Sequence, residues 1–274
     1  MARPNLSYLK NAVLAVVGVP CGVLTGLTGM TNSYLVAPLL HWLIGLRDTR
    51  LIGSALTIAS FSSLTGILAY TQHRALDWPL TIGVAIGFLF GASLGQRIGA
   101  MSPSIIVTGR VIGAVAGVLL AALMIANAYG LVRFHVLAGD AFASPWSLAW
   151  SIGLGAAAGL AGRLFDLAGL LIVPALYYIA GTTMLASQAC AMAILLANSI
   201  PAALIYARRS LIEPRSAVWM SFGALFGALG GSQAAAMHHH NREMLVVYAV
   251  ALVAVIVVRQ LSVPVAPRPG ESAH

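Results

Sequence analysis

Apolar segments separated by short polar stretches recur along the whole chain. Most are close to the roughly 20 residues that a helix needs to cross a bilayer, so the pattern predicts an all-α polytopic membrane protein. A polar connector at 129–145 divides the pattern into a first transmembrane repeat at 1–128 and a second at 146–262, followed by a disordered tail at 263–274. The expected segments are 9–29, 33–46, 51–72, 79–99 and 104–128 in the first set, and 147–162, 167–180, 184–207, 215–236 and 244–261 in the second.

Polar and small residues interrupt this pattern at residues 25–40, TGLTGMTNSYLVAPLL, and more weakly at 162–176, GRLFDLAGLLIVPAL. Interrupted segments in corresponding halves are typical of a transporter's binding site. The short segments at 33–46 and 167–180 have 14 residues each. That is about 21 Å of helix, against a hydrocarbon core of about 30 Å. We therefore expect eight full transmembrane helices plus two short or re-entrant segments, and leave open whether the short ones cross.

The chain is also duplicated. A shift of 136 positions aligns glycines, tyrosines and an acid in one ungapped register, which apolar composition alone does not explain. The pairs are Pro38–Pro174, Leu40–Leu176, Gly45–Gly181, Ser63–Ser199, Tyr70–Tyr206, Asp77–Glu213, Gly87–Gly223, Phe90–Phe226, Gly91–Gly227, Gly95–Gly231 and Met101–Met237. The glycines, spaced by four, predict close helix contact, and Asp77 and Glu213 precede helices as caps.

Five segments are an odd number, so the second copy is expected to be inverted relative to the first. With the N-terminus cytoplasmic, 11 of 14 assigned basic residues face inward, as the positive-inside rule requires. The inward ones are Arg3, Lys10, Arg47, Arg50, Arg97, Arg163, Arg208, Arg209, Arg215, Arg259 and Arg268, and the outward ones are Arg74, Arg133 and Arg242. We expect a multi-pass protein of the bacterial inner membrane with both termini in the cytoplasm.

Composition narrows the function classes. Charged residues make up 8% of the chain and 59% is hydrophobic, and the net charge of +8 is spread through the loops. This distribution argues against nucleic-acid binding. Cys21 and Cys190 lie in apolar runs without metal-ligand spacing, so we expect small core residues, and neither a metal nor another cofactor. With no nucleophile-base pair at membrane depth, no catalytic residue is proposed.

The sequence resembles the TauE/SafE family of sulfite and organosulfonate exporters over about residues 15–261. The residues that carry the resemblance are GVLTGLTGMTNSYLVAPLL at 22–40, the run 54–65, HRALDW at 73–78, GASLGQRI at 91–98, and their second-half repeats. Thr31, Asn32 and Ser33 stand where the family typically has a glycine triplet. The resemblance implies a transporter fold and a small sulfur-containing anion as substrate.

The first interruption is a candidate anion site. Thr31, Asn32 and Ser33 would cap a short helix whose free N–H groups point into the membrane, with Thr25 and Thr28 adding hydroxyl donors. Alternatively, these residues only cap the helix. In the third segment of each half, Ser62 and Ser63 correspond to Asn198 and Ser199; they either line the substrate path or hydrogen-bond between helices.

The second interruption carries charge instead. Arg163 and Asp166 lie three residues apart, close enough to pair on one helical face. Ionisable residues inside a membrane are functional candidates by default. We expect Arg163 to attract the anion and Asp166 to couple transport to a proton; a salt bridge or a position at the cytoplasmic rim is the alternative.

Together these observations favour a secondary-active carrier for sulfite or a short organosulfonate, exporting by alternating access. An uptake carrier or a passive channel for another small anion is the alternative. The expected partners are the anion and the lipid bilayer, not nucleic acid, with a homo-oligomer left open. The exact substrate, the coupling ion and the direction of transport do not follow from the sequence.

Overall fold

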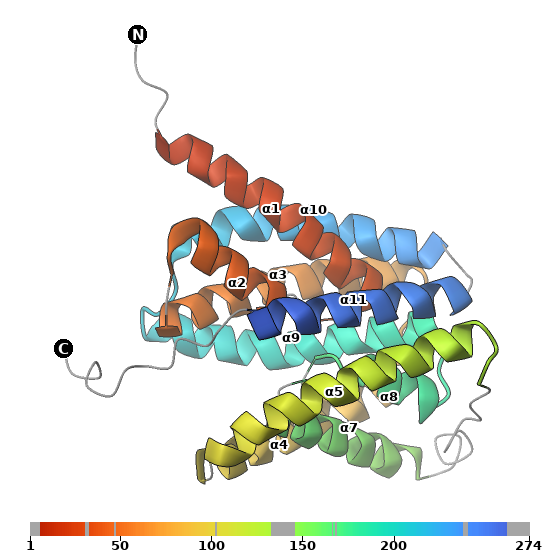
Figure 1. The fold of residues 1–274 in the computed structure, drawn as a ribbon. Helices are drawn as coiled ribbons and strands as arrows, with labels where there is room; N and C mark the ends of the chain where they lie inside the picture. The colour runs from red at the N-terminus through yellow and green to blue at the C-terminus, as the bar shows by residue number, and fades with distance from the viewer. Residues whose placement is uncertain are drawn as a thin grey trace.

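The part of the chain that the structure describes is helical throughout (Figure 1). This computed structural model describes residues 6–30, 33–46, 48–101, 103–132, 146–165, 167, 169–237 and 241–261. The predicted tail at 263–274 and most of the connector lie outside these ranges. The helices are α1 (Leu6–Thr28), α2 (Ser33–Ile44), α3 (Asp48–Gln72), α4 (Trp78–Met101), α5 (Pro103–Ala128), α7 (Ser147–Leu164), α8 (Ile172–Tyr178), α9 (Met184–Arg208), α10 (Pro214–Met237) and α11 (Asn241–Leu261).

Helix length separates the long helices from the two short ones. By length and composition, 6 helices of the described chain are candidates to cross a membrane: α1, α3, α4, α5, α9 and α11. The two short helices have 12 residues in α2 and 7 in α8. At 1.5 Å per residue, α8 spans roughly 10 Å, so it does not cross a core of about 30 Å as a helix. Eight full spans remain a prediction.

The 136-residue register found in the sequence recurs in the local structure. Asp48–Gln72 and Met184–Arg208 differ by 136 at both ends, as do Trp78–Met101 and Pro214–Met237. The turns that follow α3 and α9 each place one non-glycine residue in the left-handed region, Arg74 at φ 52° and Ser210 at φ 54°. Equivalent sequence positions thus adopt equivalent backbone conformations, which favours a true duplication.

The predicted helix caps are confirmed in both halves. A carboxylate oxygen of Asp77 accepts a hydrogen bond from the Leu80 N–H at 3.2 Å. A carboxylate oxygen of Glu213 accepts one from the Ser216 N–H at 2.6 Å. Both carboxylates satisfy first-turn N–H groups that have no partner within the helix, because those groups precede the first complete turn.

Helices of one half pack mainly on helices of the other. The most extensive contacts pair α1 with α10 and α4 with α7, and α3 packs on both α10 and α9. Figure 1 shows α1 lying along α10 at one side of the molecule, α4 and α7 at the other, and α9 between them. The register equates α1 with α7 and α4 with α10. The contact of α1 with α10 is therefore the repeat equivalent of the contact of α7 with α4.

Glycines allow these pairs to approach closely, which confirms the predicted packing role of the glycine stripes. A methyl group at most of these positions would overlap backbone atoms of the facing helix. Gly223, Gly227 and Gly231 of α10 meet Ala15, Val19 and Val23 of α1 in turn, so α1 and α10 run parallel. In α4, Gly87 and Gly91 meet Ile152 and Ala156 of α7 in the same direction.

The central pair α3 and α9 runs in the opposite sense. Gly53, near the start of α3, lies against Tyr206 near the end of α9, and Gly66 lies against Met192 nearer the start of α9. Two helices that the register equates are therefore antiparallel to each other. That is the orientation expected if the two halves are inverted.

The outer faces of the helices are apolar. The repeat pair Phe90 and Phe226 is 67% and 63% exposed, whereas the repeat glycines on the same two helices are buried. Large exposed apolar surfaces mark contact with lipid or another protein. Combined with the apolar helix lengths, they indicate a multi-pass membrane protein.

Candidate functional site

The first interruption is a left-handed turn at the end of α1. Gly29 has φ +69° and donates its N–H to the carbonyl of Thr25 at 2.8 Å. Two reasons require glycine at this position. A side chain is strained at that φ, and a Cβ would crowd the backbone of Gln188. The next helix, α2, begins at Ser33. The chain is thus broken here between two helices, as the polar pattern at 25–40 predicts.

Thr25 and Thr28 are buried at this interruption, and both hydroxyls donate to their own helix. Thr25 Oγ1 donates to the carbonyl of Cys21 at 3.0 Å. Thr28 Oγ1 donates to the carbonyl of Leu24 and accepts the N–H of Met30 at 3.2 Å. Both hydroxyl hydrogens are thus used within α1. Their part in substrate binding remains a prediction.

A buried tyrosine satisfies a carbonyl at the end of α1. The last carbonyls of a helix have no partner within it, and the N–H of Met30 is taken by Thr28. The Tyr70 hydroxyl of α3 donates to the carbonyl of Gly26 instead. Tyr70 is fully buried, so this bond joins the first interruption to the last turn of α3.

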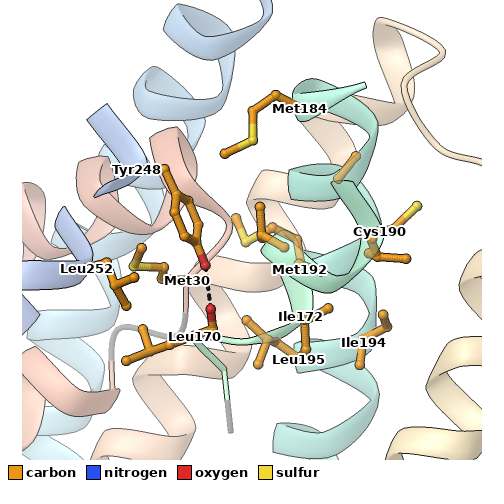
Figure 2. Packing of buried hydrophobic residues seen from close by; sticks show 14 of the residues in the cluster. Met30, Leu170, Ile172, Met184, Cys190, Met192, Ile194, Leu195, Tyr248 and Leu252 are labelled. Carbon is orange, nitrogen blue, oxygen red and sulfur yellow. Dashed lines mark hydrogen bonds between the residues drawn. The ribbon is translucent and has the colours of Figure 1, made fainter. Parts of the chain in front are cut away.

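At the second interruption, a tyrosine from another helix also satisfies a backbone carbonyl, here one that lies just before α8. Pro174 in α8 has no N–H, so the carbonyl of Leu170, four residues earlier, lacks its helical donor. The Tyr248 hydroxyl of α11 donates to that carbonyl at 2.8 Å (Figure 2). Both residues are fully buried. Each break in the helical pattern is therefore held by a tyrosine from a neighbouring helix.

The two interruptions belong to one buried cluster. Met30 from the first and Leu170 from the second are members of the same apolar core, together with Tyr248 and Met192. Figure 2 shows Met30 next to the Tyr248–Leu170 hydrogen bond. The folded chain thus brings together two stretches that are about half its length apart.

The predicted lining residues lie on α3 and α9, two antiparallel helices that pack on each other. Ser62 and Ser63 are buried, and Ser199 is 5% exposed, while Asn198 is half-buried. Ser62 Oγ donates to the carbonyls of Ile58 and Ala59, both at 3.1 Å. Ser199 Oγ donates to the carbonyl of Leu196 at 3.4 Å. The structure places the two predicted pairs on facing helices, and their contact with a substrate stays a prediction.

Other predicted residues are placed only in part. Arg163 is exposed in the last turn of α7, and its side chain lies against Gly95 of α4. Asp166, Thr31 and Asn32 lie outside the described residues, and of Ser33 only the backbone, at the start of α2, is described. The pairing of Arg163 with Asp166 therefore remains a prediction.

The two cysteines occupy the core as predicted. Both are free and buried, and Thr81 Oγ1 donates to Cys190 Sγ at 2.9 Å. Within the described ranges, no three His, Cys, Asp or Glu side chains are grouped to hold a metal ion. His238, His239 and His240 lie outside those ranges.

Sequence reasoning missed Gln188, whose side-chain Oε1 and Nε2 are buried without any hydrogen-bond partner. It is one of two buried residues of the described chain with such unpaired side-chain atoms, the other being Ser221. The sequence feature that could have drawn attention to it is an amide side chain within the apolar run MLASQACAMAILL. The 136-residue register does not draw attention to it, because its counterpart in the first half is the apolar Ile52.

Comparison with known proteins finds a family match for most of the first half. Residues 2–109 match the family model of the sulfite exporter TauE/SafE. That range contains α1 to α4, the start of α5, and the first interruption. No curated protein and no solved structure matches the chain significantly.

The TauE/SafE match confirms the resemblance inferred from the sequence over this range. The matched family is one of sulfite exporters, which are membrane transporters. The multiple apolar helices agree with this class. The extension of the resemblance to the second half rests on the 136-residue register.

Proposed function

We propose that the protein is a secondary-active exporter of a small sulfur-containing anion, sulfite or a short organosulfonate, in the bacterial inner membrane. The observation that carries this is the pair of helix interruptions, one in each half, packed into one core within a chain that matches TauE/SafE. Both termini are proposed to be cytoplasmic, on the distribution of basic residues.

The anion is proposed to bind beside the start of α2. The first N–H groups of a helix have no internal partners and carry the positive end of its dipole, so they attract anions. Thr31, Asn32 and Ser33 precede or open this helix. Ser62 and Ser63 are proposed to line the path from α3, and Asn198 and Ser199 from α9, with Arg163 attracting the anion at the rim.

Alternating access is proposed to arise from two inverted halves moving against each other. The antiparallel run of α3 and α9 supports the inversion, because the register equates these helices. The two most extensive contacts, α1 with α10 and α7 with α4, are equivalent under the register, and this equivalence also supports the inversion. The bound anion would then face each side of the membrane in turn.

Transport in proteoliposomes tests the proposal. Purified protein is expected to give saturable flux of radiolabelled sulfite that an imposed pH gradient accelerates. Empty liposomes and liposomes with heat-denatured protein are the controls. Non-saturable flux would indicate a passive channel, and no flux of sulfite or of a short organosulfonate above the controls would refute the proposed function.

Asp166→Asn is expected to uncouple transport from protons. An asparagine cannot exchange a proton, so the acceleration by a pH gradient is expected to disappear while sulfite still binds. The measurement is the ratio of initial fluxes with and without the gradient. Asp77→Asn is the matched control, because Asp77 caps α4 and is expected to keep the gradient response. An unchanged ratio in Asp166→Asn would reject proton coupling through this residue.

A further inference from the structure

The side-chain amide of Gln188 in α9 is buried without a hydrogen-bond partner. Its side chain is 0% exposed, and neither Oε1 nor Nε2 has a hydrogen-bond partner. A buried polar group without a partner is destabilising, because it has lost its hydrogen bonds to water without gaining others. Most such groups in native proteins are paired, so each unpaired one needs an explanation.

The position of Gln188 places it at the first interruption. Its backbone lies against Gly29, where α1 ends. Residues four apart share one face of a helix, so Gln188 lies between Met184 and Met192. Both methionines are fully buried in the core that also holds Met30, and Figure 2 shows both of them on the side of α9 nearest Tyr248. Gln188 is thus the polar member of an otherwise apolar stripe facing the break.

Packing alone does not explain a glutamine in this stripe. Methionine has nearly the same length and volume, and it fills the neighbouring positions of the same face. Replacing an unpaired buried polar group by an apolar one of the same shape is neutral or stabilising. The amide is therefore better explained by a partner that arrives from outside the chain.

We propose that Gln188 binds the transported anion and selects one that carries its own hydrogen-bond donor. This rests on the proposed function and adds a specificity-determining residue to it. The amide offers two N–H donors and one acceptor oxygen. Its N–H groups would bind an oxyanion oxygen, and Oε1 would accept the O–H of hydrogen sulfite or the N–H of an amino-substituted sulfonate.

Two hydroxyls near the end of α1, the helix that ends beside Gln188, support this selection. Thr25 and Thr28 donate to Cys21 and Leu24 within α1, and Thr28 Oγ1 also accepts the N–H of Met30, so a ligand would meet these oxygens as acceptors. An acceptor-only dianion such as sulfate would leave Oε1 unpaired and opposed to a negatively charged oxygen. A site built to hydrogen-bond a ligand group discriminates strongly against the analogue that lacks it.

Gln188→Met tests the proposal in proteoliposomes of the full-length protein. Labelled sulfite is used at a weakly acidic pH at which hydrogen sulfite dominates, with unlabelled sulfate as competitor. Wild-type protein is expected to prefer sulfite to sulfate. In the variant, KM for sulfite is expected to rise about 10- to 100-fold, as for the loss of one charge-assisted hydrogen bond. Inhibition of sulfite uptake by sulfate is expected to change much less, so the preference for sulfite over sulfate decreases.

Thermal unfolding separates binding from folding. Gln188→Met is expected to unfold at the wild-type temperature or above, and Gln188→Asn to recover part of the affinity. Gln96→Met, on an exposed face of α4, is the matched control and is expected to change neither measurement. A folded Gln188→Met variant with wild-type KM and preference would refute the role of Gln188 while leaving the transport function intact. Absence of flux of both sulfite and a short organosulfonate in wild-type protein would refute the proposed function itself.

Discussion

Gly155→Leu is expected to destabilise the protein by about 3 kcal/mol, the upper part of the usual range for over-packing. Gly155 of α7 faces α4, where a Cβ would overlap the carbonyl oxygen of Val84 and lie 2.9 Å from the backbone nitrogen of Phe88. Backbone atoms of a packed helix cannot turn aside as a flexible side chain does. The larger side chain is therefore expected to force α4 and α7 apart, with a lower unfolding temperature in detergent.

Gly153→Leu is the matched control on the same helix. Gly153 is exposed, and a Cβ at this position would meet no other atom within 4 Å. Leucine has a better helix propensity than glycine, so this variant is expected to unfold at or slightly above the wild-type temperature. Equal unfolding temperatures for the two variants would contradict the close contact of α4 with α7.

Tyr248→Phe is the second substitution with a large expected effect. It removes the donor to the carbonyl of Leu170, which Pro174 leaves without a helical partner. An unpaired buried acceptor is expected to cost about 2 kcal/mol, and the second interruption is expected to lose its defined shape. We therefore expect both a lower unfolding temperature and reduced sulfite flux. Tyr70→Phe is expected to do the same at the first interruption, where the carbonyl of Gly26 loses its donor.

Tyr206→Phe is the control for both tyrosine variants. Tyr206 is the repeat counterpart of Tyr70 but is only half-buried in α9, so removal of its hydroxyl is expected to have little effect on stability or flux. Wild-type behaviour of Tyr70→Phe and Tyr248→Phe would show that the two carbonyl bonds do not maintain the interruptions.

Much of the fold follows from local pattern. The segment predicted at 184–207 is α9 (Met184–Arg208), and the one predicted at 79–99 is α4 (Trp78–Met101). Long apolar stretches leave little ambiguity, because a backbone surrounded by lipid must satisfy its hydrogen bonds internally. Of the two short segments, 33–46 matches α2 (Ser33–Ile44) closely, whereas α8 (Ile172–Tyr178) covers only part of 167–180. Pro174 and the turns before α8 shorten this helix, and a hydropathy pattern does not show such backbone turns.

The candidate site was predicted less completely than the fold. Thr25 and Thr28 were expected to add hydroxyl donors to the anion site, yet each donates to a carbonyl of its own helix. Residue type shows that a hydroxyl is present but not where its hydrogen points. For Gln188, the sequence shows an amide in an apolar run but not its environment. Only the folded structure shows that α9 packs against Gly29 and that the amide is buried and unpaired.

The sequence by itself determined the membrane-protein class, the ten apolar segments, the 136-residue duplication, the capping acids and the glycine stripes. These features are local, or they compare one stretch of sequence with another. Only the tertiary structure decided that α1 pairs with α10 and α4 with α7, that α3 and α9 run antiparallel, and that tyrosines from α3 and α11 hold the interruptions. The physical reason is that a hydrogen-bond partner or a helix contact depends on what folds against a residue, and that neighbour is distant in the chain.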